Sequence, residues 1–125
     1  MTYTLHAPAG SFRAFKILIA AEYNGIEIDI PEFDATVAAS LSPTGKAPVL
    51  QISSSSSGGE EIIFESHSIA RYVARMRRDR GLTGNGVMEE AAVDSWCDFC
   101  MNNVELPACV WWYPVAGYMP FQQQA

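Results

Sequence analysis

The chain has 125 residues, 49% of them hydrophobic and 18% charged, a composition typical of a folded globular protein with an apolar core. Its formal net charge is −6, and an acidic balance argues against direct nucleic-acid binding. No uninterrupted apolar run reaches the roughly 18 residues of a membrane span, and the N-terminus lacks a basic region followed by an apolar one. Three cysteines, an odd number, suit a reducing compartment. We therefore expect a cytoplasmic protein without membrane insertion.

The first elements predicted in chain order are a strand over residues 2–7 and a helix over residues 12–23. Ser11 is a typical first cap of such a helix, because its hydroxyl can accept hydrogen bonds from the free N–H groups. Residues 26–33, IEIDIPEF, alternate apolar and acidic side chains. This period of two predicts a half-buried strand.

A short helix is predicted over residues 35–41, followed by two strands over residues 48–53 and 60–65. Residues 54–59, SSSSGG, have the composition of a flexible linker. Because the run is short and both flanks are strands, we expect a mobile hairpin loop instead.

The turn before these strands contains Gly45-Lys46, which could be mistaken for part of a phosphate-binding loop. Such a loop needs Ser or Thr after its lysine, and here Ala47 follows. Pro48 then opens the strand, a place where proline is tolerated and where the preceding bond can be cis at a small cost. The residues alone leave the isomer of Ala47-Pro48 open.

A further helix is predicted from Ser66, which we expect to cap it. Its apolar stripe consists of Ile69, Val73 and Met76. Three arginines share another face: Arg71, Arg75 and Arg78.

The composition changes after this helix, since residues 81–125 contain no Lys or Arg. We divide the chain into a domain at 1–80, a linker at 81–87 and a helical segment at 88–125. In the last segment an apolar stripe at helical spacing consists of Val93, Trp96, Cys100 and Val104. An acidic row lies opposite: Asp94, Asp98 and Glu105. Pro107 predicts a kink or an end of the helix.

The Cys97-Asp98-Phe99-Cys100 motif suggests redox chemistry at first sight. Redox cysteines, however, lie at the start of the first helix of thioredoxin-like folds, where PAGSF stands here. We therefore expect the pair to contribute to a core. With only two histidines, neither in ligand spacing, we expect no metal site. The Trp111-Trp112-Tyr113 cluster is also expected in a core.

The order of these elements is that of a thioredoxin-like fold. KAPVL (46–50) and FESHSIARYVA (64–74) together resemble the VPxL and ESxAIxxYL patterns of the cytosolic glutathione S-transferase family. A closer resemblance is to the transferase-like domains of the elongation factor 1 gamma subunits. It is carried by FRAFKILIAAEYNG (12–25), PTGKAPVL (43–50), FESHSIARYV (64–73) and PACVWWYPVAG (107–117).

The resemblance implies an α/β fold. Residues 1–80 would form the thioredoxin-like N-terminal domain, and residues 88–125 the first helix or two of an all-α C-terminal domain that is truncated here. It implies a scaffold that anchors the exchange subunits of elongation factor 1, in a homodimer formed through the third and fourth helices. The alternative is an active enzyme that conjugates glutathione, or a glutathione-containing dithiol, to electrophiles.

The resemblance also implies a thiol site without a further cofactor. Ala47, before a cis Pro48, would offer its backbone to the cysteinyl part of glutathione. Glu65 and Ser66 would receive the γ-glutamyl group. Lys46 either lies near the glycyl carboxylate or is simply solvated. The alternative for Glu65 and Ser66 is that Ser66 only caps the helix and Glu65 is only a solvated residue at the strand end.

Catalysis in the serine-type enzymes needs a hydroxyl four residues before the helix arginine, Arg13 in this chain. That position is Ala9. The remaining candidates for stabilising a thiolate are Ser11, two residues later, and His6 at the strand end. The absence of a hydroxyl at Ala9 predicts slow chemistry.

Overall fold

The structure of the chain, a computed structural model, describes residues 1–54 and 58–121. It forms two compact units, residues 1–85 and the part of the chain from Gly86 on. The first unit contains β1 (Thr2–His6), α1 (Phe12–Asn24), α2 (Ala35–Leu41), β2 (Val49–Ser53), β3 (Glu60–Phe64), α3 (Ser66–Arg75) and a 3₁₀ turn (Arg78–Arg80). The second contains α4 (Val87–Phe99), a π-helical segment (Cys100–Glu105) and α5 (Leu106–Ala116).

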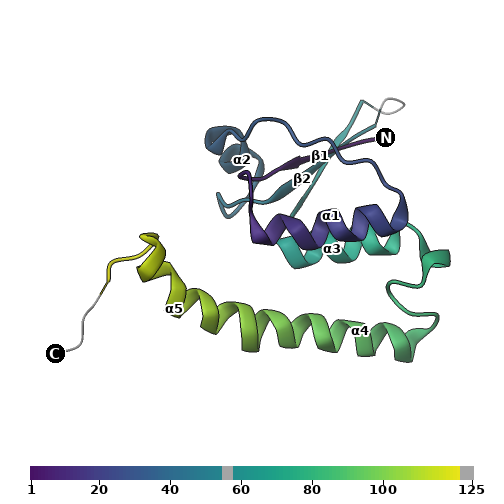
Figure 1. The fold of residues 1–125 in the computed structure, drawn as a ribbon. Helices are drawn as coiled ribbons and strands as arrows, with labels where there is room; N and C mark the ends of the chain where they lie inside the picture. The colour runs from purple at the N-terminus through teal and green to yellow at the C-terminus, as the bar shows by residue number, and fades with distance from the viewer. Residues whose placement is uncertain (55–57, 122–125) are drawn as a thin grey trace. The chain divides into compact units, whose positions relative to one another are not determined.

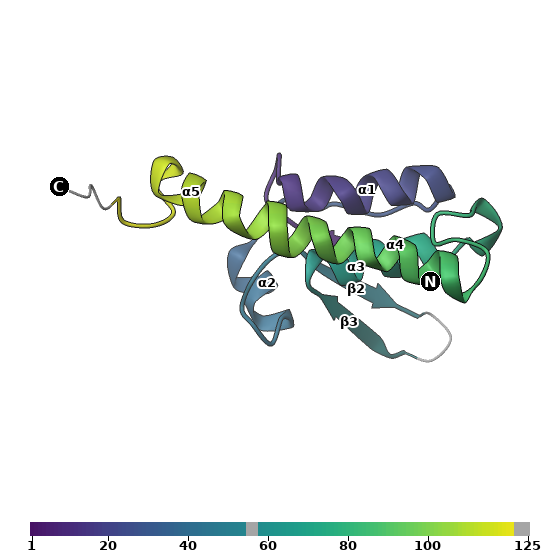
Figure 2. The ribbon, with the colours of Figure 1, turned by 90° about the horizontal axis from the view of Figure 1, so that it is seen from below.

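The sheet has the strand order β1-β2-β3, and both pairs are antiparallel. The predicted hairpin between β2 and β3 is confirmed. The middle of its loop, residues 55–57, lies outside the described residues. Figures 1 and 2 show α1 and α3 side by side on one face of the sheet. Leu5 packs in the same core cluster as Ile17 of α1 and Ile69 of α3.

The predicted strand over residues 26–33 is wrong. Asp29 forms a single parallel bridge with Thr4. In this bridge the Leu5 N–H donates to the Asp29 carbonyl and the Asp29 N–H to the Tyr3 carbonyl, both at 2.8 Å. The next donor of a parallel ladder would be residue 31. Pro31 has no N–H, so the ladder stops after one bridge.

The core of the first unit lies between the sheet and its two long helices. Its fully buried apolar side chains come from β1, α1, β2 and α3: Leu5, Ile17, Leu50, Ile69 and Val73. Burying one such side chain is worth about 1.5–3 kcal/mol. This burial is the main reason why α1 and α3 stay on the sheet.

Asn24, the last residue of α1, is fully buried. Its side-chain Nδ2 donates to the carbonyl oxygens of Val73 at 2.7 Å and Ala74 at 3.1 Å. These carbonyls belong to the last turn of α3, where helical partners run out. Asn24 therefore ties the C-terminal ends of the two helices together.

Helix α3 is shorter than its charge pattern suggested. Ile69 and Val73 are buried as predicted. The helix ends at Arg75, so Met76 is its C-cap and Arg78 lies in the following 3₁₀ turn. The predicted row of three arginines on one helix is therefore wrong, because only two of them are helical residues.

The second unit is one continuous helical stretch from Val87 to Ala116, since the residues at each junction keep right-handed helical dihedrals. Pro107 was expected to kink or end the helix, and the helix continues through it (Figure 1). A proline in an α-helix removes an N–H and its ring meets the carbonyl four residues earlier. The π segment just before Pro107 has the wider i→i+5 pattern, which removes this conflict.

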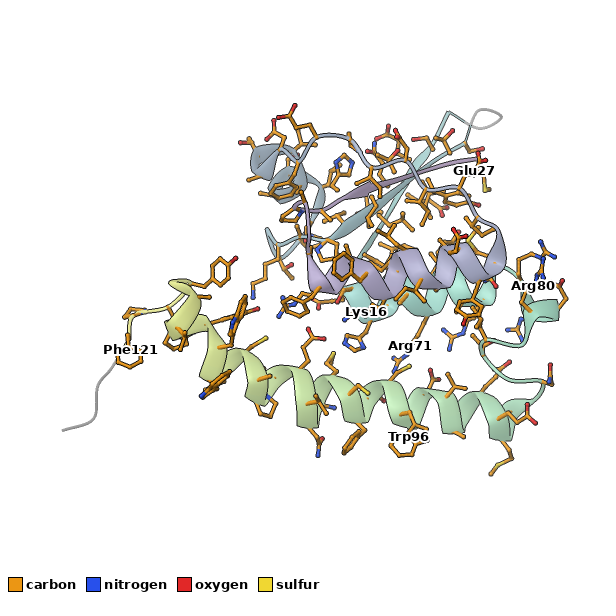
Figure 3. All side chains as sticks on the ribbon, viewed as in Figure 1. Lys16, Glu27, Arg71, Arg80, Trp96 and Phe121 are labelled. Atoms are coloured by element: carbon orange, nitrogen blue, oxygen red, sulfur yellow. The ribbon has the colours of Figure 1, made fainter. Side chains whose placement is uncertain are left out.

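The apolar side chains of the second unit are largely exposed. Trp96 is 69% exposed and Trp111 is 73% exposed, and Figure 3 shows Trp96 extending from α4. The expected core position of the Trp111-Trp112-Tyr113 cluster is therefore wrong for Trp111. Among the described residues of this unit, Cys109 is the buried apolar one.

No described helix combines the length and apolarity needed to cross a membrane.

Candidate functional site

Three segments of the first unit meet at one end of the sheet. In the register of the sheet His6 is opposite Val49, and Val49 is opposite Phe64. Ala47-Pro48 comes immediately before β2, and Glu65-Ser66 immediately follows β3. Neighbouring strands are about 4.8 Å apart. The structure thus brings the two predicted residue pairs together, next to the end of β1.

The Ala47-Pro48 peptide bond is cis, as the resemblance implied. Pro48 is buried, Ala47 is half-buried and Lys46 is exposed. Within the described part of the chain, no backbone hydrogen bond of Ala47 occurs among those of the turns, loops and caps. Its N–H and C=O can therefore pair with an extended ligand in the manner of a strand.

Glu65 has a φ of 68° and a ψ of 115°, and it is the one non-glycine residue of the described chain with a positive φ. A residue held in such a sparsely populated region costs about 1–3 kcal/mol. Its position is the N-cap of α3, although its side chain makes no capping hydrogen bond. Glycine would fit this backbone at a lower cost. The presence of glutamate therefore suggests that the side chain itself is used.

Ser66 is the first residue of α3 and is buried, with 6% of its surface exposed. The prediction that Ser66 caps the helix is therefore wrong by one residue. Its hydroxyl lies instead in the first turn, where backbone N–H groups are not yet used by the helix. Such a helix start favours a carboxylate ligand.

His6 is 9% exposed, and its Nε2 is 2.9 Å from the side-chain oxygen of Gln51 on β2. Its backbone position places it on the sheet face opposite Leu5, which belongs to the core. The hydrogen bond holds the imidazole against β2. This arrangement favours a structural role for His6 over a catalytic one.

Ser11 is at the N-cap position of α1, as predicted, but its side chain makes no capping hydrogen bond. Its carbonyl accepts hydrogen bonds from Ala14 and Phe15 at 3.0 and 3.3 Å. The predicted hydroxyl cap is therefore wrong. Ala9 is exposed in the preceding turn and offers no hydroxyl. Ser11 thus keeps a hydroxyl that the helix start does not use.

Three polar residues that stabilise the first unit were not identified from the sequence. Asp34 caps α2 by accepting hydrogen bonds from the N–H groups of Thr36 at 2.8 Å and Val37 at 3.2 Å. An aspartate just before a helical run is the signal that could have revealed it. Gln51 could have been placed on the His6 face from strand alternation. Asn24 had no such signal, because its acceptors lie about fifty residues away.

Tyr72 on α3 has a shifted pKa. Burial raises the pKa of the Tyr72 hydroxyl, and Tyr3 and Glu61 raise it further. In residues 1–54 and 58–121 no group of three or more His, Cys, Asp or Glu side chains is arranged to hold a metal ion. The site therefore consists of backbone groups, a helix start, one carboxylate and one hydroxyl.

This arrangement on a small sheet packed with α1 and α3 is the thioredoxin-like fold of glutathione S-transferase N-terminal domains. Residues 10–76 match the family described as "Glutathione S-transferase, N-terminal domain". The chain belongs to this family.

The relatives with higher sequence identities than the solved transferases described below are translation factors. A "Probable elongation factor 1-gamma 1" from Arabidopsis thaliana is 36% identical over 132 residues, which cover 100% of this chain and 30% of the relative. An "Elongation factor 1-gamma" from Artemia salina is 34% identical, covering 92% of this chain and 26% of the relative. The chain thus spans less than a third of the length of these curated relatives.

Solved transferases share the fold. Poplar glutathione transferase F1 superposes with a TM-score of 0.76 at 17% identity, covering 100% of this chain and 58% of the transferase. A Caenorhabditis elegans transferase gives a TM-score of 0.73 at 23% identity, covering 97% of this chain and 56% of the transferase. At these identities the match describes the fold.

Proposed function

We propose that this chain is the transferase-like part of an elongation factor 1-gamma-type subunit. In this role it acts in the cytoplasm as a scaffold that anchors the nucleotide-exchange subunits of the elongation factor 1 complex. One observation carries the proposal: the elongation factor relatives match 92–100% of this chain at 34–36% identity in plants and a crustacean. The match extends well beyond residues 10–76, the part that matches the transferase N-terminal domain family.

Exposed apolar surface supports a scaffold role. The face of α1 that carries Phe15, Ile19 and Tyr23 is half exposed or more, and these residues line an open apolar pocket. The second unit adds Trp96 and Trp111. Exposed apolar patches of this kind commonly mark protein contacts.

Binding of the 125-residue chain to a purified exchange subunit of elongation factor 1 tests the scaffold role. We expect a complex that survives size-exclusion chromatography, and weaker binding after Trp111→Ala. Asn102→Ala is the matched control, because it changes an exposed polar residue of the same unit. No complex at tens of micromolar would refute the anchoring role.

We propose further that the Ala47-Pro48 and Glu65-Ser66 pairs form a retained site for glutathione or a related thiol. Their adjacency across the β2-β3 ladder, the backbone of Ala47 and the unusual φ of Glu65 support this. The same residues favour the second candidate function, a transferase acting on electrophiles. Ala9 argues against fast chemistry, since losing one stabilising donor typically costs a hundredfold or more in rate, about 10²–10³.

Calorimetry with glutathione, combined with a chloronitrobenzene assay, separates the two candidates. We expect binding that Ser66→Ala and Glu65→Gln weaken, with turnover at least about a hundredfold below that of a serine-type transferase. Ser95→Ala is the control, because this serine is exposed on α4 and bonds only its own helix. Ordinary transferase rates would favour the enzyme, and no detectable binding would exclude the site.

The resemblance to transferases also supports a homodimer through α3 and α4. Burying a large aromatic side chain such as Trp96 is worth about 1.5–3 kcal/mol, whereas an exposed ion pair contributes about 0–1 kcal/mol. We therefore expect a dimer that persists in high salt. Sedimentation in low and high salt tests this, and a monomer at tens of micromolar in both buffers would contradict it.

A further inference from the structure

The Cys97-Asp98-Phe99-Cys100 motif has no role in the proposed function. We expected the pair in a core, and that expectation is wrong for Cys100, which is exposed, while Cys97 is half-buried. Both thiols are free. The pair lies at the end of α4, far along the chain from the first helix where thioredoxin-like redox cysteines stand.

The backbone brings the two cysteines onto one face of the helix. The N–H of Cys100 is shared between the carbonyls of Trp96 and Cys97, so the chain turns tightly at this point. Residues three and four apart on a helix have Cβ atoms about 5–6 Å apart. Met101 is four residues after Cys97 and is 39% exposed. Three sulfur atoms therefore belong to one surface of the second unit.

This spacing suits a bridging ion better than a disulfide. A disulfide needs Cβ atoms about 3.5–4.5 Å apart, closer than a helix turn provides. A metal–thiolate bond of about 2.3 Å lets two sulfurs on one ion be up to about 4.6 Å apart, and the Cβ–S bonds add reach. The sulfurs can thus converge on one ion without a change in the helix.

The ligand set selects the ion. Structural zinc takes four ligands in a tetrahedron, and the described residues hold no group of three or more His, Cys, Asp or Glu side chains arranged for a metal. Thiolate and thioether ligands are soft and favour Cu(I). Cu(I) is also satisfied by two or three sulfur ligands, the number present here.

We propose that Cys97, Cys100 and Met101 bind one Cu(I) ion through two thiolates and one thioether. Binding releases the two thiol protons, so it strengthens as the pH rises. The exposed Cys100 provides the way in. This site revises the expectation that the chain holds no metal, and it is independent of the proposed scaffold and thiol functions.

Anaerobic titration of the 125-residue chain with Cu(I), buffered by a chromophoric Cu(I) chelator, tests the site with native mass spectrometry as the readout. We expect one retained copper per chain, and none with Cys97→Ser/Cys100→Ser. Met101→Leu should weaken binding by about tenfold or more, the range found when a site loses a supporting group. Cys109→Ser is the control and should bind like the unchanged chain, because Cys109 is buried and nine residues further on.

Three results would overturn the proposal. Equal copper retention in the double variant, with circular dichroism showing an unchanged helix content, would place the ion elsewhere. Loss of copper in Cys109→Ser alone would do the same. Loss of two hydrogens without copper would show that the pair forms a disulfide instead of a metal site.

Discussion

The two units of the chain use apolar residues in opposite ways. In the first unit, helix and strand faces meet, and side chains such as Leu50 and Ile69 are fully buried. In the second unit, one helix carries Leu106 and Trp111 with 60% and 73% of their surfaces exposed. The comparison teaches that a periodic apolar pattern predicts which side chains share a face. Burial additionally needs a second surface to cover that face.

The largest expected difference between the units is in the loss of unfolding free energy when a leucine is replaced by alanine. Leu50→Ala should lower the free energy of unfolding by about 2–5 kcal/mol, because it leaves a cavity in the core. Leu106→Ala should change it by no more than about 0.5 kcal/mol. Chemical denaturation followed by far-ultraviolet circular dichroism measures both. A large effect of Leu106→Ala would mean that the second unit is covered in solution.

The next effect compares a buried polar link of the first unit with an exposed polar residue of the second. Asn24→Ala removes the donor to the carbonyls of Val73 and Ala74, which should cost about 1–3 kcal/mol in unfolding free energy. Asn102→Ala, an exposed asparagine in the second unit, should cost little. Equal losses in denaturation experiments would show that the α1–α3 link does not stabilise the first unit.

Two helix starts of the first unit allow a finer comparison. Asp34→Ala removes a cap that bonds two N–H groups, and it should destabilise the protein by about 1 kcal/mol. Ser11→Ala should have a clearly smaller effect, because the Ser11 hydroxyl makes no capping hydrogen bond. The difference between the urea unfolding midpoints of the two variants measures how much the Asp34 cap stabilises the protein. A larger loss for Ser11 would contradict the observed geometry.

The smallest effect concerns the 3₁₀ turn after α3 in the first unit. Asp79 receives hydrogen bonds from Arg77 at 2.9 and 2.8 Å, and this partner lowers the pKa of Asp79 to about 2 from its usual 3.8. A lowered pKa means that the contribution to stability is complete above about pH 3.8 and is lost as the pH falls through 2. Because both side chains are exposed, the effect on global unfolding should be slight.

Carbon-detected NMR titration of the Asp79 carboxyl measures this pKa. Arg77→Gln should return the midpoint toward its usual value, and added salt should shift it in the same direction. An unchanged midpoint in Arg77→Gln would show that the ion pair does not persist in solution.

The fold of the first unit could be largely predicted from local signals. The predicted ranges of β1, β2, β3, α1 and α2 agree with the structure within one or two residues. The strand over residues 26–33 failed because alternation does not reveal how many ladder bonds a strand can make, and Pro31 limits them to one bridge. The helix through Pro107 failed because a wide π-turn before a proline has no signature in apolar spacing.

The candidate site could be predicted only in part. Resemblance to a known family indicated Ala47-Pro48 and Glu65-Ser66, and the sheet register brings these pairs together. The backbone strain at Glu65 could not be predicted, since it depends on contacts set by tertiary packing. The same holds for Asn24, whose acceptors come from another helix.

The π segment at Cys100–Glu105 also bears on how this chain can change in length. Each i→i+5 turn encloses one residue more than an α-turn. Gaining or losing a single amino acid there exchanges one kind of turn for the other, while the helices on both sides keep their directions. The alignment with the Arabidopsis relative spans 132 positions against 125 residues, so the two lineages differ by insertions or deletions. A one-residue insertion or deletion in Cys100–Glu105 is therefore compatible with an unbroken helix.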